Sequence, residues 1–212
     1  MKKEELIDIL EKLKKEYPEA VCSLDFKTPL EMAIAVLLSA QCTDERVNKV
    51  TPMLFKRCKN VQDFADIDLK ELEEIIYPCG FYKNKAKNIK LLAEKLLKDF
   101  NGEVPNTMEE LITLPGIGRK SANVIMLEAF NNPQGVAIDT HAKRICNRLG
   151  ISKSPDPIKI EQDLLKKLPK ECYYDANHLL VFHGRKTCKA RNPECNKCVL
   201  EKYCKNKITV IE

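Results

Sequence analysis

The 212-residue chain contains no tryptophan, few other aromatic residues and only 7 glycines against 11 prolines. Its longest unbroken apolar run, Met32–Leu38, is far shorter than the ~20 residues that a bilayer-spanning helix requires. The segment Met1–Glu5 is charged and has no apolar stretch typical of a signal peptide. No low-complexity tract or internal repeat occurs. We therefore expect a protein that is neither exported nor contacts a membrane.

Strand patterns are also scarce, whereas apolar residues recur with helical spacing. Three such stripes comprise Leu6, Leu10, Leu13 and Tyr17; Ile89, Leu92, Leu96 and Phe100; and Ile160, Leu164 and Leu168. Thr28–Glu31 matches a capping box with proline at the first helical position. It precedes an almost wholly apolar helix, which we expect at the centre of the core. The sequence predicts an all-α protein of about nine or ten helices.

Positive charge is concentrated near the C-terminal end. The formal net charge is +5, but the segment 183–207 carries +6 and the remainder sums to −1. A basic cluster of this kind fits a polyanionic partner. It is equally typical of a solvated terminal segment, and charge alone does not decide between the two.

Ten cysteines are many for a chain without an export signal, because a reducing cytosol does not favour structural disulfides. Six are scattered, and we interpret them as small buried hydrophobic residues. These are Cys22, Cys42, Cys58, Cys79, Cys146 and Cys172. The other four are Cys188, Cys195, Cys198 and Cys204, separated by six, two and five residues. Four thiolates so close together can bind one metal centre.

The uneven spacing favours an iron–sulfur cluster, because a structural zinc site usually has two C-x2-C pairs and only one is present. Zinc stays the alternative. Ligation by Cys188 and Cys195 would close a loop and present Lys189 and Arg191 outward. The metal would then order a basic loop for binding phosphate. Electron transfer is the other role open to it.

A Pro-Gly-Ile-Gly turn joins two predicted helices at Pro115–Gly118. Gly116 and Gly118 permit backbone conformations and close approaches that other residues resist. The N–H groups at the start of the second helix would form an anion site. An ordinary turn between two helices is the alternative.

Lys120 lies in the first turn of that second helix, where the helix dipole disfavours a lysine. Phosphate contact is one reason for a lysine here, and an amine nucleophile, which must be uncharged to attack, is the other. The dipole contributes only ~0.3–1 kcal/mol, whereas one pKa unit requires ~1.36 kcal/mol. We therefore expect Lys120 to be shielded from bulk water, so that desolvation favours the neutral amine.

Asp139 can reach the same place. The helix from Lys120 would extend ~16 Å, and the segment 131–138 can span up to ~26 Å on the way back. We interpret Asp139 as the N-cap of the helix that ends at Gly150, a role compatible with facing a cleft.

Together these motifs resemble the endonuclease III family of helix–hairpin–helix DNA glycosylases. The residues that carry the resemblance are Leu114–Lys120, Val136–His141, Leu38–Asp44, Val181–Arg185 and the four clustered cysteines. The resemblance extends from about Asp25 to Cys204, which is most of the chain.

The resemblance implies two helical domains with duplex DNA in the cleft between them. Residues 22–133 would form a six-helix barrel with the helix–hairpin–helix motif. Residues 1–21 plus 134–212 would form a domain with a [4Fe–4S] cluster, bound by Cys188, Cys195, Cys198 and Cys204. The implied function is base excision repair by a DNA glycosylase and AP lyase that flips out damaged bases, which the resemblance implies are oxidised pyrimidines. The resemblance also implies a cytoplasmic, prokaryotic protein that acts as a monomer and is associated with the nucleoid through DNA.

Carried over by position, Lys120 is the nucleophile and Asp139 the catalytic carboxylate. Gln41 is similar to the residue that fills the gap left by the flipped nucleotide. Phe81 occupies the position of an apolar wedge, where leucine is more usual, and Cys79 replaces an aliphatic residue. The remaining implied DNA contacts are Gly116, Gly118, Arg119, His141, Lys189 and Arg191.

Two other functions fit the same pattern. An adenine mismatch glycosylase of this superfamily usually lacks the lysine at the position of Lys120 and continues well past the cluster, whereas eight residues follow Cys204 here. A non-catalytic, metal-stabilised DNA-binding or redox-sensing protein fits the helices, the basic segment and the cysteines. Only Lys120 together with Asp139 argues against it.

Overall fold

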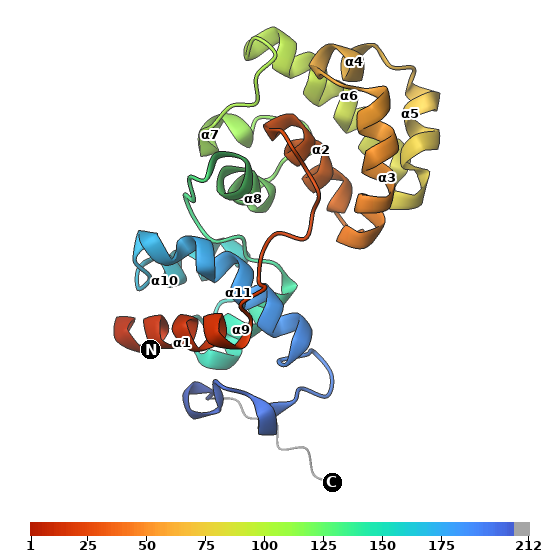
Figure 1. Cartoon of the computed structure of the whole chain (residues 1–212). Coiled ribbons are helices and arrows are strands. Elements are labelled where there is room, and N and C mark those ends of the chain that lie inside the picture. Colours follow the sequence, from red (N-terminus) through yellow and green to blue (C-terminus); the bar gives the residue numbers. More distant parts are fainter. Residues whose placement is uncertain (206–212) are drawn as a thin grey trace. The chain divides into compact units, whose positions relative to one another are not determined.

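The computed structural model describes residues 1–205, and within them it is helical, with no strand (Figure 1). The α-helices are α1 (Lys3–Glu16), α2 (Pro29–Ser39), α3 (Asp44–Arg57), α4 (Val61–Asp66), α5 (Leu69–Ile76), α6 (Tyr82–Asp99), α7 (Met108–Leu111), α8 (Arg119–Phe130), α9 (Thr140–Leu149), α10 (Pro157–Leu165) and α11 (Tyr173–Lys186). The 3₁₀ helices are η1 (Tyr77–Cys79), η2 (Lys170–Cys172), η3 (Cys195–Lys197) and η4 (Glu201–Tyr203). The predicted all-α fold is confirmed. No helix in the described part combines the length and hydropathy needed to span a bilayer.

The helix starts follow the capping residues of the sequence. The hydroxyl of Thr28 accepts a hydrogen bond from the N–H of Glu31 at 3.2 Å and so caps α2. Asp68 and Thr107 cap α5 and α7 in the same way. Gly150, with a φ of +71°, ends α9 in the left-handed conformation that favours glycine. The structure has more helices than expected because α4 and α7 are too short to show a periodic apolar stripe.

The described chain forms two compact units. The first unit is Ser23–Asn132 and contains α2 to α8. The second unit combines Met1–Cys22 with the described chain from Pro133 onward. In the first unit α2 contacts α3, α6 and α8, and all of Met32–Leu38 is buried. The prediction that this apolar helix is central to a core is therefore confirmed.

In the second unit α11 contacts both α1 and α9, and α10 packs against α9. The predicted stripe of α1 is buried here, as are Ile160, Leu164 and Leu168. The core of this unit thus combines the first helix of the chain with its last third. Lys207, which contributes to the predicted basic segment, lies outside the described residues.

The scattered cysteines are only partly core residues. Cys58, Cys79 and Cys146 are buried, and burial raises the pKa of the Cys146 thiol to about 12. The half-buried ones are Cys22, Cys42 and Cys172. For these three the interpretation as buried hydrophobic residues is wrong, because part of each side chain still meets solvent.

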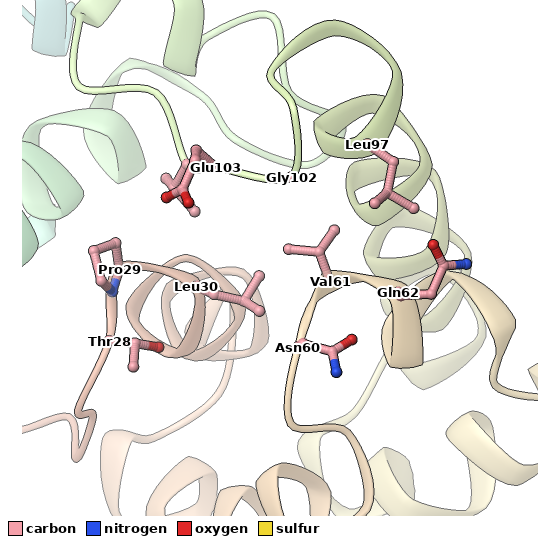
Figure 2. Close-up of a pocket in the computed structure, with 10 residues that line it drawn as sticks. Thr28, Pro29, Leu30, Asn60, Val61, Gln62, Leu97, Gly102 and Glu103 are labelled. Atoms are coloured by element: carbon pink, nitrogen blue, oxygen red, sulfur yellow. The ribbon is translucent and has the colours of Figure 1, made fainter.

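An open pocket of about 430 Å³ lies in the first unit (Figure 2). Leu30 from α2 and Val61 from α4 contribute to its apolar lining, together with Leu97 of α6. Glu103 and Asn60 supply polar groups. No residue of the predicted site lines this pocket.

A buried asparagine of α11 holds the segment that leads into α9. Asn177 is 7% exposed, and its Oδ1 accepts a hydrogen bond from the N–H of Ala137 at 2.8 Å. Its Nδ2 donates to the carbonyls of Gly135 at 3.1 Å and Tyr173 at 2.7 Å. The bonds to Gly135 and Ala137 satisfy backbone groups that lie outside any helix. Asn177 therefore fixes Gly135 and Ala137, in the segment that leads to Ile138 and Asp139.

We predict that Asn177→Leu lowers the free energy of unfolding by about 1–3 kcal/mol, because it leaves buried backbone groups without partners. Urea denaturation measures the change. The control is Lys186→Leu at the exposed end of the same helix, which should change stability by less than about 0.5 kcal/mol. Equal losses in the two variants would contradict the anchoring role.

Candidate active site and cluster loop

The predicted helix–hairpin–helix turn joins α7 to α8 and is anchored by the buried Leu114 and Ile117. Gly116 has a φ of +80°, and a Cβ there would lie 2.8 Å from Cδ1 of Leu37 and 3.2 Å from Cβ of Asn88. Both the left-handed conformation and the close approach to α2 and α6 require glycine. The geometry expected of Gly116 is confirmed, and its contact with DNA stays a prediction.

At Gly118 the expectation of a special backbone conformation or a close approach is wrong. Its φ of −97° and ψ of 177° are extended values open to any residue, and no atom lies within 4 Å of a Cβ built there. Gly118 is the N-cap of α8 and supplies no side chain to close the helix end. The open space leaves the N-terminal turn of α8 accessible to a phosphate. The backbone and packing at position 118 therefore do not by themselves require glycine.

Lys120 is the second residue of α8, and its side chain is exposed. Arg119 beside it is exposed as well. The expectation that Lys120 is shielded from bulk water is therefore wrong for the protein by itself. An exposed amine is accessible to a ligand from outside the protein, and exclusion of water around it would have to come from a ligand that covers it.

Asp139 is the N-cap of α9, as predicted. Its Oδ1 accepts a hydrogen bond from the N–H of Ala142 at 2.7 Å, and the residue is half-buried. Lys120 belongs to the first unit and Asp139 to the second. The chain therefore supplies the two predicted reactive groups from separate units.

Arg144 connects α9 to the end of α11. Its guanidinium donates to the carbonyls of Gly184 at 2.7 Å and Cys188 at 2.9 Å, and it lies 3.1 Å from Nδ1 of His141. Because a guanidinium can only donate, Nδ1 of His141 is the acceptor and Nε2 carries the proton of the neutral ring. A Cβ on Gly184 would lie 2.7 Å from Cβ of His141, so this approach requires glycine. The ring of His141 is thus fixed two residues after Asp139.

The four clustered cysteines follow α11 in the segment that contains η3 and η4. The pKa of the Cys198 thiol is raised, chiefly by burial and further by the neighbouring thiols of Cys188, Cys204 and Cys195. Among residues 1–205, no three His, Cys, Asp or Glu side chains form a group that could hold a metal ion. The structure therefore brings the thiols near one another without arranging them as ligands, and the metal stays a prediction.

A second arginine of α9 is directed at this segment. Nη1 of Arg148 donates to Sγ of Cys188 at 3.2 Å and to the carbonyl of Lys189 at 2.8 Å. Guanidinium hydrogen bonds are strongest with ionised acceptors, so this contact suits a thiolate better than a thiol. Nε2 of His183 lies 3.6 Å from Sγ of Cys198. The arginine donor at Cys188 therefore fits a metal-ligating thiolate.

The loop between the first two cysteines carries less free positive charge than expected. Nζ of Lys189 lies 2.6 Å from Oε1 of Glu194, and this ion pair lowers the pKa of the Glu194 carboxyl. Arg191 is exposed and forms no ion pair within the described chain. Arg191 is therefore the residue of this loop that presents an uncompensated charge outward.

Gln41 and Phe81 lie on two different turns of the first unit. Gln41 follows α2 and is exposed, and Phe81 is the N-cap of α6 and is 66% exposed. An exposed aromatic side chain at the end of a helix is available to a partner. Their roles in DNA remain predictions.

The comparisons with known proteins agree with these motifs. The model of the HhH-GPD superfamily of base excision DNA repair proteins matches residues 34–170. The chain is 50% identical to endonuclease III of Synechocystis sp. over 96% of this chain and 93% of that protein, and 44% identical to that of Bacillus subtilis over 92% and 90%. A solved structure of a trapped endonuclease III–DNA covalent intermediate is 42% identical, with a TM-score of 0.91 over 97% of this chain and 96% of the other. The predicted resemblance is confirmed, and the chain belongs to the endonuclease III family of HhH-GPD base excision DNA repair proteins.

Proposed function

We propose that Lys120 is the nucleophile and Asp139 the catalytic carboxylate of a bifunctional DNA glycosylase and AP lyase in base excision repair. The observation that carries the proposal is the exposed amine of Lys120 in the first turn of α8. The N-cap residue of this helix, Gly118, has no side chain that could cap the helix end. A phosphate bound at that turn would bring a nucleotide backbone to the amine. The 42% identical structure is that of a trapped, covalent endonuclease III–DNA intermediate, and such an adduct requires a nucleophile on the protein.

The reaction begins with extrusion of the damaged nucleotide, because its sugar cannot be attacked inside the stacked duplex. The lone pair of the neutral Lys120 amine attacks C1′, and the base leaves with the electrons of the glycosidic bond. The sugar ring then opens as the C1′–O4′ electrons pass to O4′, which gives a Schiff base between Nζ and C1′. The C2′ proton is now acidic, and its removal expels the 3′ phosphate by β-elimination. We propose oxidised pyrimidines as the damaged bases.

Asp139 is suited to stabilise positive charge on the sugar and to move protons in these steps. A carboxylate near an amine also favours the protonated, unreactive amine. The hydrogen bond from the N–H of Ala142 holds the Asp139 carboxylate in a fixed orientation at the start of α9.

Two kinds of DNA contact complete the proposal. Gln41 fills the gap left by the extruded nucleotide, and Phe81 enters beside the opposite strand. Phosphates are bound by the backbone at Gly116 and Gly118 and by four side chains, those of Arg119, His141, Lys189 and Arg191. A non-covalent endonuclease III–DNA complex, 42% identical to this chain, supports duplex DNA as the partner. Since such a substrate is chromosomal, we place the protein at the nucleoid.

Members of the endonuclease III family carry a [4Fe–4S] cluster. In this chain we propose that it is held by Cys188, Cys195, Cys198 and Cys204. The arginine donor 3.2 Å from Sγ of Cys188 is the feature of the structure that fits ligating thiolates. When bound, the cluster would tie four points of this segment together, and so order the loop that presents Arg191.

Borohydride reduction tests the nucleophile, because it converts a Schiff base into a stable amine. We expect the wild-type protein to be trapped on duplex DNA with an abasic site, and Lys120→Gln to reduce the trapped fraction by about 100-fold or more. Lys98→Gln, at an exposed lysine of α6, is the control and should trap normally. Equal trapping of the wild type and Lys120→Gln would contradict the assignment of Lys120 as the nucleophile. No trapping by the wild type would leave a DNA-binding protein without catalysis.

The metal proposal predicts a brown protein with visible absorption from thiolate-bound iron. Arg148→Met removes the donor to Sγ of Cys188, and we expect iron to be lost to a chelator about tenfold faster, followed as decay of that absorption. Lys143→Met is the control, since this α9 side chain donates instead to the carbonyl of Pro155 at 2.6 Å. Colourless protein with stoichiometric zinc, or unchanged iron loss in Arg148→Met, would contradict the proposal.

The phosphate role of the cluster loop predicts a salt effect. Arg191→Ala should weaken binding to every DNA sequence alike and reduce the slope of log K against log salt concentration by about 1. Fluorescence anisotropy at several salt concentrations measures the slope. Lys15→Ala, at an exposed lysine of α1, should leave it unchanged. A loss confined to one lesion would show that Arg191 reads something other than the backbone.

A further inference from the structure

The two side chains that we propose to enter the duplex sit on strained turns. Gln41 has a φ of +53° and Phe81 a φ of +49°, the left-handed region that residues other than glycine seldom adopt. Backbone strain of this kind persists only where the surrounding contacts determine the conformation. Both turns belong to the first unit, one after α2 and the other between η1 and α6. The contacts around the two turns therefore show what holds Gln41 and Phe81 in this conformation.

One buried lysine is bonded to both turns. Lys85 of α6 is 4% exposed, and its Nζ donates to the carbonyls of Leu38 and Cys79, each at 2.8 Å. Leu38 precedes Gln41 by three residues, and Cys79 precedes Phe81 by two. A single ammonium thus joins the two turns close to the residues that they expose.

This ammonium has no carboxylate partner within the described chain. The other ionisable groups that act on it are the thiols of Cys42 and Cys79, and burial lowers the pKa of Lys85. A buried charge costs free energy unless its hydrogen bonds compensate. A methionine would fill a similar space without that cost. The hydrogen bonds of Lys85, rather than its bulk, therefore explain its presence.

We propose that Lys85 is a positioning residue for base flipping, whose ammonium holds the Gln41 and Phe81 turns at a fixed separation. The inference rests on the DNA contacts proposed for those two side chains. Extrusion of one nucleotide leaves a gap in its own strand and an unpaired base opposite, so both strands must be supported together. Lys85 contacts no DNA in this account and acts only through the two turns.

A purely structural role is the competing explanation. The carbonyl of Leu38 is one of the last in α2, where carbonyls lack helical partners and a nearby cation is stabilising. Loss of such a contact would lower stability and reduce cleavage of every substrate alike. Loss of positioning would instead appear only where paired DNA has to be opened.

The same helix offers a matched control. Nζ of Lys90 donates to the carbonyls of Ala65 and Ile67, each at 2.6 Å. Lys90 is thus a second lysine of α6 bonded to two carbonyls, but these lie at the C-terminal end of α4, where no DNA contact is proposed. Lys90→Met removes a similar pair of hydrogen bonds and leaves the two inserting turns untouched.

The experiment compares wild type, Lys85→Met and Lys90→Met on two DNAs with the same oxidised pyrimidine. In one the lesion is fully paired, and in the other it lies in an unpaired bubble. We expect Lys85→Met to cleave the paired DNA about 10- to 100-fold more slowly in single turnovers. On the bubble DNA the cleavage rate of Lys85→Met should stay within about threefold of the wild-type rate. Fluorescence of a 2-aminopurine beside the paired lesion, which reports unstacking, should fall in Lys85→Met but not in Lys90→Met.

Equal losses on both DNAs, or the same loss in Lys90→Met, would overturn the positioning role. If the wild type cleaves neither DNA, the proposed function fails and the inference fails with it. Lys85→Gln, which keeps an amide donor, serves if Lys85→Met does not fold. In a Gln41→Ala, Phe81→Ala background Lys85→Gln should add no further loss on paired DNA. An additive loss would show that Lys85 acts by another route.

Discussion

A lysine nucleophile has to be uncharged to react and accessible to its substrate, and these demands conflict in a free protein. Accessibility prevails in this structure, because Lys120 is exposed in the first turn of α8. The helix dipole supplies only ~0.3–1 kcal/mol toward the neutral amine. Most of the required desolvation must therefore come from the DNA itself. We therefore propose that Lys120 becomes reactive only when the bound DNA covers it.

The second unit shows how a metal could affect a site built from other residues. Asp139 caps α9, His141 follows it, and Arg144 and Arg148 extend from the same helix to the segment around Cys188. The two arginines are four residues apart and so share a helix face. A cluster that fixes this segment would also fix α9, and with it the carboxylate at its start. Structural support for Asp139 is thus a role for the metal that needs no electron transfer.

Local chemistry accounts for what could be predicted from the sequence. The hydroxyl of Thr28, the carboxylate of Asp139 and the left-handed turn at Gly116 each act within a few residues of their own position. The close approach of Gly116 to Leu37 and Asn88 is not local. Asn177 and Lys85 had no such signal, because one key backbone partner of each, Ala137 and Leu38, lies 40 and 47 residues away. A polar residue in an otherwise apolar helix face is the only hint that either one leaves in the sequence.

The exposure of Lys120 and the pairing of Lys189 with Glu194 were missed for different reasons. Shielding of Lys120 would have to come from a ligand, which lies outside the chain. The second depends on how a loop folds back, which the cysteine spacing alone does not determine. Charge counts along the sequence therefore overstated the free positive charge of this loop.

The central claim is that one amine of the protein bonds to the sugar of an extruded nucleotide. Proteolysis of the borohydride-reduced adduct, followed by peptide mass spectrometry, identifies the residue that carries the deoxyribose remnant. We predict that the remnant is on Nζ of Lys120. A remnant on another lysine or on the N-terminal amine would contradict the account.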